Sequence, residues 1–102
     1  MAGQRAVIYL RGTGRGQLDD AEKRCGEYAQ RFGWQVLKSV RDANDGSGLG
    51  QLLMQVNELR IQIIITGSLD MISPDQSIRD DLMATIERSQ CIVQPVEMSP
   101  RP

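Results

Sequence analysis

Residues that could bind an anion gather in a short glycine-rich stretch near the start of the chain. This stretch reads Arg11-Gly12-Thr13-Gly14-Arg15-Gly16 and lies between a predicted strand and a predicted helix. Glycines at such a junction let backbone N–H groups approach an anion at a helix N-terminus, and Arg11 and Arg15 would add positive charge. Because position 17 is Gln, the pattern is GxGxG and not the GxGxxG of dinucleotide-binding loops. The stretch predicts either an anion or nucleotide site, or only a tight turn; the candidate site residues are Arg11, Gly12, Thr13, Gly14 and Arg15.

Histidine is absent from the 102 residues, and the two cysteines, Cys25 and Cys91, are far apart. A Ser-His or Cys-His nucleophile system is therefore impossible, and we expect neither a zinc site nor another cofactor. We interpret the cysteines as small apolar residues and not as a disulfide.

The charge of the chain is nearly balanced, with 12 basic and 13 acidic side chains. Neutralising phosphates requires a surplus of Lys and Arg, so holding a nucleic-acid backbone is not expected to be the main task of this domain. The longest apolar run, Ile63–Ile65, is too short to span a bilayer, and the first residues lack a signal-peptide pattern. We expect a cytoplasmic protein that does not contact a membrane.

Hydrophobic periodicity predicts strands that alternate with helices along the whole chain. Strands are expected at 5–11, 34–40, 61–66 and 91–96. Short, largely apolar strands of this kind, separated by helices, predict an α/β fold. The expected architecture has three αβα layers around a four-stranded, mainly parallel sheet of βαβαβαβ order. One domain is expected over 1–98, followed by a flexible tail at 99–102.

Three amphipathic helices are expected between these strands. The first covers 17–32, with Gly33 in the position of a C-cap, and the second covers 49–59. Ser73 is expected to cap the third helix, with Pro74 in its first turn. The residues of this helix that should point inward are Ile78, Leu82 and Ile86.

Ligand sites in parallel sheets form in the loops that follow the carboxyl ends of the strands. The loops that qualify are 11–17, 42–50 and 67–75. Arg11 ends the first strand and is expected to pair with Asp42 or Asp70, which would fix these loops together. Met71 and Ile72 are unusually apolar for a loop, so they either fold inward or form an exposed contact for a partner.

Several motifs fall in register with one known family. They are Tyr9-Leu10-Arg11-Gly12-Thr13, Gly33-Trp34, the loop from Asp42 to Gly48, Leu52-Leu53, and the segment from Arg60 to Asp75. Over about 5–96 the chain resembles the catalytic domain of serine recombinases, the resolvase and invertase family. In that family the first motif reads Tyr-x-Arg-Val-Ser, and its serine attacks a DNA phosphate and becomes covalently linked to it. The resemblance implies a resolvase-like fold and a connection with DNA recombination.

The chain departs from the family at the positions that carry the chemistry. Thr13 stands in place of the nucleophilic serine, and Met71 and Pro74 stand in place of two arginines. Removing one donor that stabilises transition-state charge typically costs about 2.7–4 kcal/mol, so losing two would nearly abolish phosphoryl transfer. Of the catalytic group, Arg11 and Asp70 remain. The resemblance therefore implies a catalytically inactive domain, a pseudoenzyme.

Three hypotheses on function follow. The first is an inactive recombinase-like domain that acts as a regulatory or protein-interaction module, with another protein or a second copy of itself as partner. The second is a diverged recombinase fragment that a partner subunit completes. The third is an anion-binding or nucleotide-binding domain that uses the turn at 12–16. Active family members continue into a long helix and a DNA-binding domain, so this domain alone is expected to bind DNA weakly.

Overall fold

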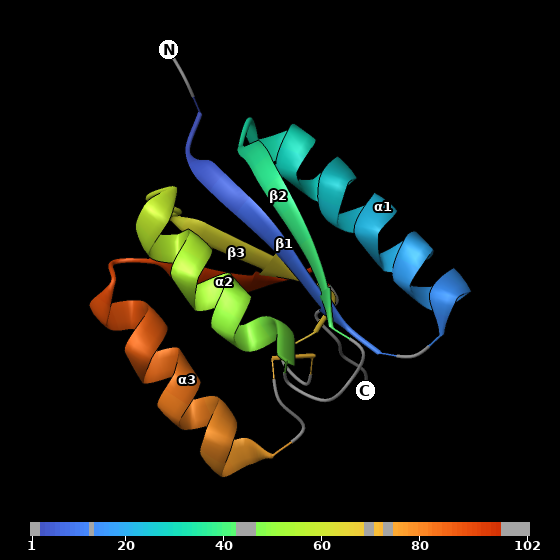
Figure 1. Cartoon of the computed structure of the whole chain (residues 1–102). Coiled ribbons are helices and arrows are strands. Elements are labelled where there is room, and N and C mark those ends of the chain that lie inside the picture. Colours follow the sequence, from blue (N-terminus) through green and yellow to red (C-terminus); the bar gives the residue numbers. More distant parts are fainter. Residues whose placement is uncertain (1–2, 13, 43–46, 69–70, 73–74, 97–102) are drawn as a thin grey trace, which may run out of the picture.

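The computed structural model describes residues 3–12, 14–42, 47–68, 71–72 and 75–96 (Figure 1). Strands and helices alternate along the chain, as the sequence predicts. They are β1 (Arg5–Arg11), α1 (Arg15–Phe32), β2 (Gln35–Asp42), α2 (Ser47–Glu58), β3 (Ile63–Thr66), α3 (Gln76–Arg88) and β4 (Ile92–Pro95).

The four strands form one sheet in the order β2-β1-β3-β4, and every pair is parallel. Figure 1 shows α1 on one face of this sheet and α2 and α3 on the other. The predicted α/β class, with three layers around a parallel sheet, is confirmed. β1 lies between β2 and β3 and has an apolar layer on each face. Because both of its faces are buried, its sequence is apolar nearly throughout.

An apolar layer lies on each face of the sheet. On the side of α1, Ile8 and Leu10 of β1 pack with Ile65 of β3. On the side of α2 and α3, Val7 and Tyr9 pack with residues of both helices. Successive residues of a strand point to opposite faces, so β1 contributes side chains to both layers. Packing on both faces holds β1 in place and so positions Arg11 at its carboxyl end.

The end of α1 was predicted correctly. Gly33 has a positive φ of 72°, and its N–H donates to the carbonyl of Gln30, as expected for a left-handed C-cap. Trp34 follows at once and stacks on Phe32, with ring centroids 5.0 Å apart and an interplanar angle of 18°. The helix begins at Arg15, two residues before the predicted start.

The prediction that Ser73 caps the third helix is wrong. α3 begins at Gln76, and Asp75 is its N-cap, because Asp75 Oδ1 accepts hydrogen bonds from the N–H groups of Ser77 and Ile78 at 2.9 and 3.2 Å. Ser73 and Pro74 lie outside the described residues.

The expected inward face of α3 is only partly correct. Ile86 is buried and Leu82 packs against the core, but Ile78 is 51% exposed. In Figure 1 the first turn of α3 lies farther from the sheet than the rest of the molecule around it, which agrees with the exposure of its side chains.

β2 is an edge strand that Arg41 connects to α1. The guanidinium of Arg41 bonds Asp19 at 2.7 Å and Glu22 at 2.9 Å, and these hydrogen bonds raise the pKa of Arg41 above its ordinary value. The pair is exposed, so its contribution to stability is small. Among the described helices, none is both long and apolar enough to cross a membrane.

Candidate functional site

β1, β2 and β3 have their carboxyl ends at one edge of the sheet, and the described residues that begin the three predicted loops lie at this edge (Figure 1). Arg11 and Asp42 are register partners at the ends of β1 and β2. The N–H of Gly12 donates to the carbonyl of Asp42 at 3.0 Å and extends this pairing by one residue. Parallel pairing thus brings together residues that are about thirty positions apart in the sequence.

The carboxylate of Asp42 joins three segments. Its Oδ2 accepts a hydrogen bond from the hydroxyl of Tyr9 at 2.8 Å and another from the N–H of Gly48 at 2.9 Å. Asp42 is 1% exposed and Tyr9 is completely buried, so these bonds form away from solvent. A negative group at the first turn of α2 also interacts favourably with the positive end of the helix dipole. Asp42 therefore fixes the start of α2 against β1 and β2.

Gly48 is required by its close approach to Asp42. A Cβ atom at this position would lie 3.1 Å from Asp42 Oδ2 and 3.2 Å from a methyl carbon of Val40. Both separations are shorter than ordinary contacts of a Cβ atom, so a side chain at position 48 would force the buried Val40 and Asp42 to shift by a few tenths of an ångström. Close packing therefore explains why the residue at position 48, which ends the Asp-rich loop, is a glycine.

Arg11 does not pair with Asp42 as expected. Its Nη1 donates instead to the backbone carbonyl of Ile72 at 3.2 Å, while the Asp42 carboxylate bonds Tyr9 and Gly48. Arg11 Nε is buried and has no hydrogen-bond partner among the described residues. The other expected partner, Asp70, lies outside the described residues. Arg11 therefore connects the end of β1 to the segment that follows β3.

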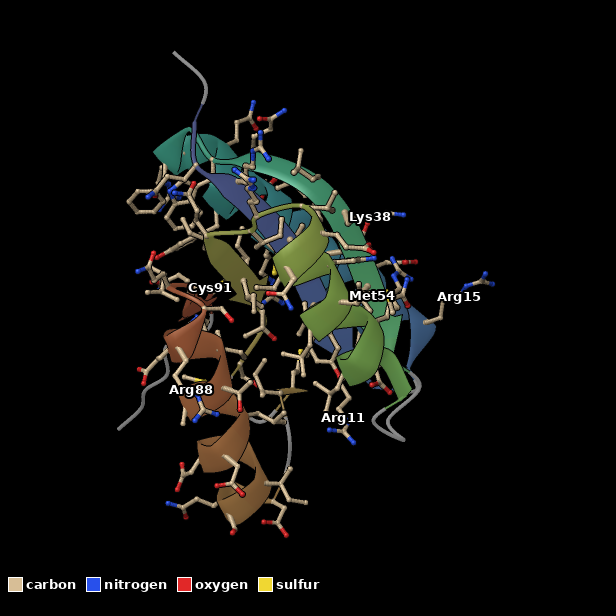
Figure 2. The ribbon with its side chains drawn as sticks, turned by 60° about the vertical axis from the view of Figure 1, so that its left-hand side comes forward. Arg11, Arg15, Lys38, Met54, Arg88 and Cys91 are labelled. Carbon is tan, nitrogen blue, oxygen red and sulfur yellow. The ribbon has the colours of Figure 1, made fainter. Side chains whose placement is uncertain are left out.

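The glycine-rich turn is only partly arranged as an anion site. Gly14 is the N-cap of α1, and no side chain of the described residues caps this helix start. Its first N–H groups are therefore not held by a capping side chain. Figure 2 shows, however, that the side chains of Arg11 and Arg15 point in different directions, with Arg15 reaching into solvent. Thr13, between Gly12 and Gly14, lies outside the described residues.

Met71 and Ile72 fold inward, which was one of the two expected alternatives. Ile72 is fully buried, and Met71 packs against the apolar layer beneath α1. A Cβ atom added to Gly67 would come within 2.9 Å of the sulfur of Met71, so this side chain lies directly over the Gly67 backbone. Met71 is thus a partly buried side chain that belongs to the packing beneath α1. Pro74, the other position where the family has an arginine, is outside the described residues.

Sequence reasoning missed the bond between Tyr9 and Asp42. A signal for it exists: Tyr9 occupies an interior position of a strand that is apolar on both faces, and a buried tyrosine hydroxyl usually has a polar partner. Asp42, at the end of the neighbouring strand, is a suitable acceptor once the strand order is known.

No protein-family model matches the sequence, and no curated protein matches it. Several solved structures do. The chain is similar to the C-terminal catalytic domain of ISC1926 TnpA, an IS607-like serine recombinase, with a TM-score of 0.78 and 19% identity, covering 93% of this chain and 71% of that one. For the N-terminal catalytic domain of TP901-1 integrase, the TM-score is 0.81 at 17% identity, with 91% and 77% covered.

A third match is the first ORF in transposon ISC1904 from Sulfolobus solfataricus P2, with a TM-score of 0.73, 14% identity, and 95% and 70% of the two chains covered. The predicted likeness to serine recombinase catalytic domains is therefore confirmed at the level of the fold. Identities this low establish the fold alone, so an activity must be argued from the residues of the site.

Proposed function

We propose that this chain is a serine-recombinase-like domain that has lost DNA strand transfer and acts as a regulatory or protein-interaction module in DNA recombination. The observation that carries the proposal is the inward packing of Met71 over Gly67. The resemblance gives this position to an arginine, whose guanidinium would have to face the phosphate. A thioether in the apolar layer offers no positive charge to a transition state.

Arg11 supports the same conclusion. Its Nη1 is engaged by the carbonyl of Ile72, so part of the remaining guanidinium serves to hold the loop. The buried bond between Tyr9 and Asp42 connects β1 to the end of β2, so this part of the scaffold does not depend on the changed catalytic positions. A domain that keeps its scaffold while its catalytic positions change is typical of a protein that works by binding.

The proposal is tested by incubating the purified domain with supercoiled plasmid DNA and trapping covalent protein–DNA complexes in denaturing gels. An active serine recombinase on its own site serves as the positive control. We expect no complex above the level of Thr13→Ala. A complex that needs Thr13 would overturn the proposal and favour the recombinase fragment that a partner completes.

The interaction part of the proposal has its own measurement. Sedimentation equilibrium of the domain, alone and mixed with an active serine recombinase, detects a homo-oligomer or a mixed complex. We expect association in at least one arm. If the domain stayed monomeric both alone and in the mixture, a partner with the serine recombinase fold would be excluded.

A second candidate function is anion or nucleotide binding at the start of α1. The specific observation that favours it is the N-terminus of α1, where Gly14 provides no capping side chain and the first turn has no acidic residue. A thermal-shift screen of phosphate compounds tests it, because a ligand at about 100 times its dissociation constant adds roughly 2.7 kcal/mol to stability. If Arg15→Gln left every shift unchanged, the turn would not be the binding site.

A further inference from the structure

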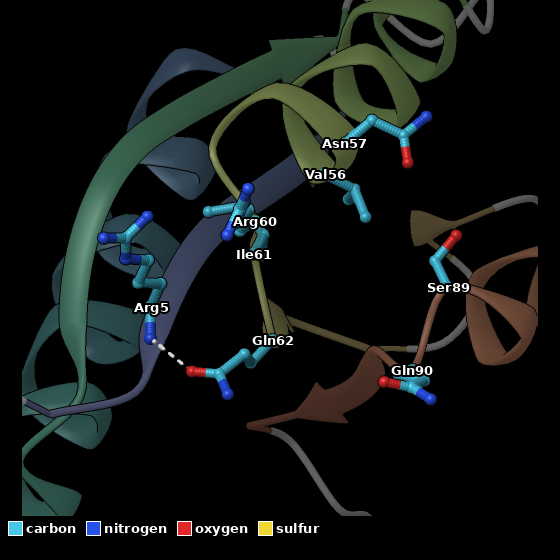
Figure 3. Close-up of a pocket in the computed structure, with 8 residues that line it drawn as sticks. All are labelled: Arg5, Val56, Asn57, Arg60, Ile61, Gln62, Ser89 and Gln90. Carbon is cyan, nitrogen blue, oxygen red and sulfur yellow. Dashed lines mark hydrogen bonds between the residues drawn. The ribbon is translucent and has the colours of Figure 1, made fainter.

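A polar pocket of about 500 Å³ opens at the amino ends of the strands (Figure 3). It lies at the edge of the sheet opposite Arg11 and Asp42, and its lining comes from the start of β1, the end of α2, the residues before β3 and the turn after α3. Figure 3 shows Arg5 and Arg60 on one side and Ser89 and Gln90 on the other. Neither the proposed function nor the fold requires this pocket.

The lining is rich in hydrogen-bond donors and positive charge. It contains two arginines and no acidic residue. Gln62 Oε1 accepts a hydrogen bond from the backbone N–H of Arg5 at 3.2 Å, so the NH₂ end of this amide is the end left for a ligand. The hydroxyl of Ser89 and the amide of Gln90 add donors on the far side. Such a set selects a ligand with many acceptor oxygens.

Hydrogen bonds lessen the negative potential of the two helix ends that border the pocket. A helix C-terminus carries partial negative charge on its last carbonyl groups, which by itself repels anions. Here several of these carbonyls already accept hydrogen bonds. Arg5 Nη1 donates to the carbonyl of Leu59 at 3.0 Å, and the N–H of Ile61 donates to that of Val56 at 3.0 Å. At the end of α3, the N–H groups of Ser89 and Gln90 likewise donate hydrogen bonds to carbonyl groups of the last turn.

The two helix ends that border the pocket also place a polar side chain each at a left-handed position. Within the described residues, the non-glycine residues with positive φ are Arg60, at 54°, and Gln90, at 60°, and both line this pocket. The left-handed conformation costs a residue with a side chain roughly 1–2 kcal/mol, and glycine would avoid that cost. Both residues lie just past the end of a helix, where the N–H of Ile61 donates to the carbonyl of Val56 and that of Cys91 to the carbonyl of Ile86, so the ends of α2 and α3 account for these conformations. Glycine is the usual residue at such a position, and the chain instead has an arginine and an amide at the two helix ends that line the pocket.

From these observations we propose that the pocket binds a small molecule that carries a phosphate or carboxylate group. The anionic group contacts Arg60 and the NH₂ of Gln62. The uncharged part of the molecule lies on Val56 and Ile61, whose buried side chains form an apolar floor. The volume lies within the range of small-molecule sites, about 300–1,000 Å³.

The test uses the whole chain labelled with ¹⁵N and titrated with inorganic phosphate, AMP and citrate. We expect amide shifts to gather at 60–62 and 89–90, with a dissociation constant on the order of 1 mM or lower for at least one probe. The separate phosphate and carboxylate probes identify the preferred anion. Shifts centred on 14–17 with none at 60–62 would overturn the proposal and support the site at the start of α1. No shift with any probe would also overturn it.

Variants separate binding from folding. Arg60→Gly removes the guanidinium and relieves the positive φ, so we expect stability that is unchanged or higher and binding that is about tenfold or more weaker. Lys38→Gln removes one positive charge from exposed β2, away from the pocket, and should leave binding unchanged. If Arg60→Gly and Lys38→Gln weakened binding equally, the anion would be attracted by positive charge in general and not by this pocket, and the proposal would be overturned. Gln62→Ala provides a second variant with the backbone at position 60 untouched, and it should also weaken binding.

Discussion

Asp42 is the residue on which the arrangement of the carboxyl edge depends most. Its side chain accepts from Tyr9 and Gly48, and its carbonyl accepts from Gly12. A buried carboxylate is costly unless hydrogen bonds satisfy it, so each of these donors matters more than an exposed one would. Removing a donor leaves the negative charge in place without part of its compensation.

Tyr9→Phe is therefore expected to destabilise the domain by about 1.5–3 kcal/mol, the usual range for a hydrogen bond to a charged group. Urea unfolding measures the change. Asp42→Asn in the Tyr9→Phe background should cost less than Asp42→Asn alone, because the two side chains share one bond. Additive effects of the two substitutions would contradict the coupling described here.

The sequence allowed only part of this site to be predicted. Arg11 and the three loops could be placed at one edge, because parallel strands bring their carboxyl ends together. The partner of Arg11 could not be predicted, because the sequence offers two carboxylates nearby and gives no sign that Arg11 donates to the backbone carbonyl of Ile72 instead. Nor does the sequence show whether Met71 points inward, since one thioether fits both a core and a contact surface.

Cys91 leads to a prediction about pH. Burial raises the pKa of its thiol from the ordinary 9.0 to about 11. In the unfolded chain this thiol loses its proton first, so the unfolded state binds fewer protons between pH 9 and 11 and stability falls with rising pH in that window. Two pKa units correspond to at most about 2.7 kcal/mol, and below about pH 8 the thiol should have no effect.

Guanidinium unfolding of the native chain and of Cys91→Ala between pH 7 and about 11 checks this expectation. The alanine variant should start less stable, because a buried side chain is shortened, but it should lose less stability as the pH rises. Parallel curves for the two proteins would show that the thiol is not the cause.

At the scale of the elements, α3 shows how a helix start can be misplaced. Ser73-Pro74 and Asp75-Gln76 are both reasonable starts, since Ser and Asp are good N-caps and Pro favours the first turn. The structure uses Asp75, which bonds two N–H groups of the first turn. Such choices differ by a few tenths of a kcal/mol in propensity, so tertiary packing decides them.

Asp75→Ala should destabilise the domain by about 0.5–2 kcal/mol, through the loss of the cap. Thermal unfolding followed by circular dichroism measures it. Ser73→Ala is the matched control and should change stability by less than about 0.5 kcal/mol. A larger loss from Ser73→Ala than from Asp75→Ala would place the cap at the earlier residue.

The strands were predicted better than the helix starts for a physical reason. β1 was predicted with its observed bounds, because its apolar run is bordered by charged and glycine residues. β3 begins at Ile63 and not at 61, because the N–H of Ile61 still bonds the carbonyl of Val56 at the end of α2. Apolar residues next to a strand are equally suited to finish a helix, and periodicity alone does not separate the two.

At the scale of the whole molecule, balanced charge limits what the domain can do alone. Twelve basic and 13 acidic side chains give a net charge of −1. Electrostatic attraction to phosphates dominates unspecific DNA binding, so we expect a dissociation constant weaker than about 10⁻⁴ M for duplex DNA at physiological salt. Fluorescence anisotropy with labelled duplexes measures it. Micromolar binding that falls steeply with salt would instead reveal a basic surface strong enough to hold DNA.

The central place of β1 in the sheet sets an order for folding. Of the four strands, β1 is synthesised first, and it can pair with β2 once residues up to 42 have left the ribosome. The other edge of β1 stays unpaired until β3 has been synthesised, because Ala6 of β1 pairs with Ile63 of β3. Contacts of such long range slow folding and leave an apolar strand edge unprotected in the meantime. We infer that a nascent chain ending between α2 and β3 is the form of this protein most prone to aggregate and most in need of a chaperone.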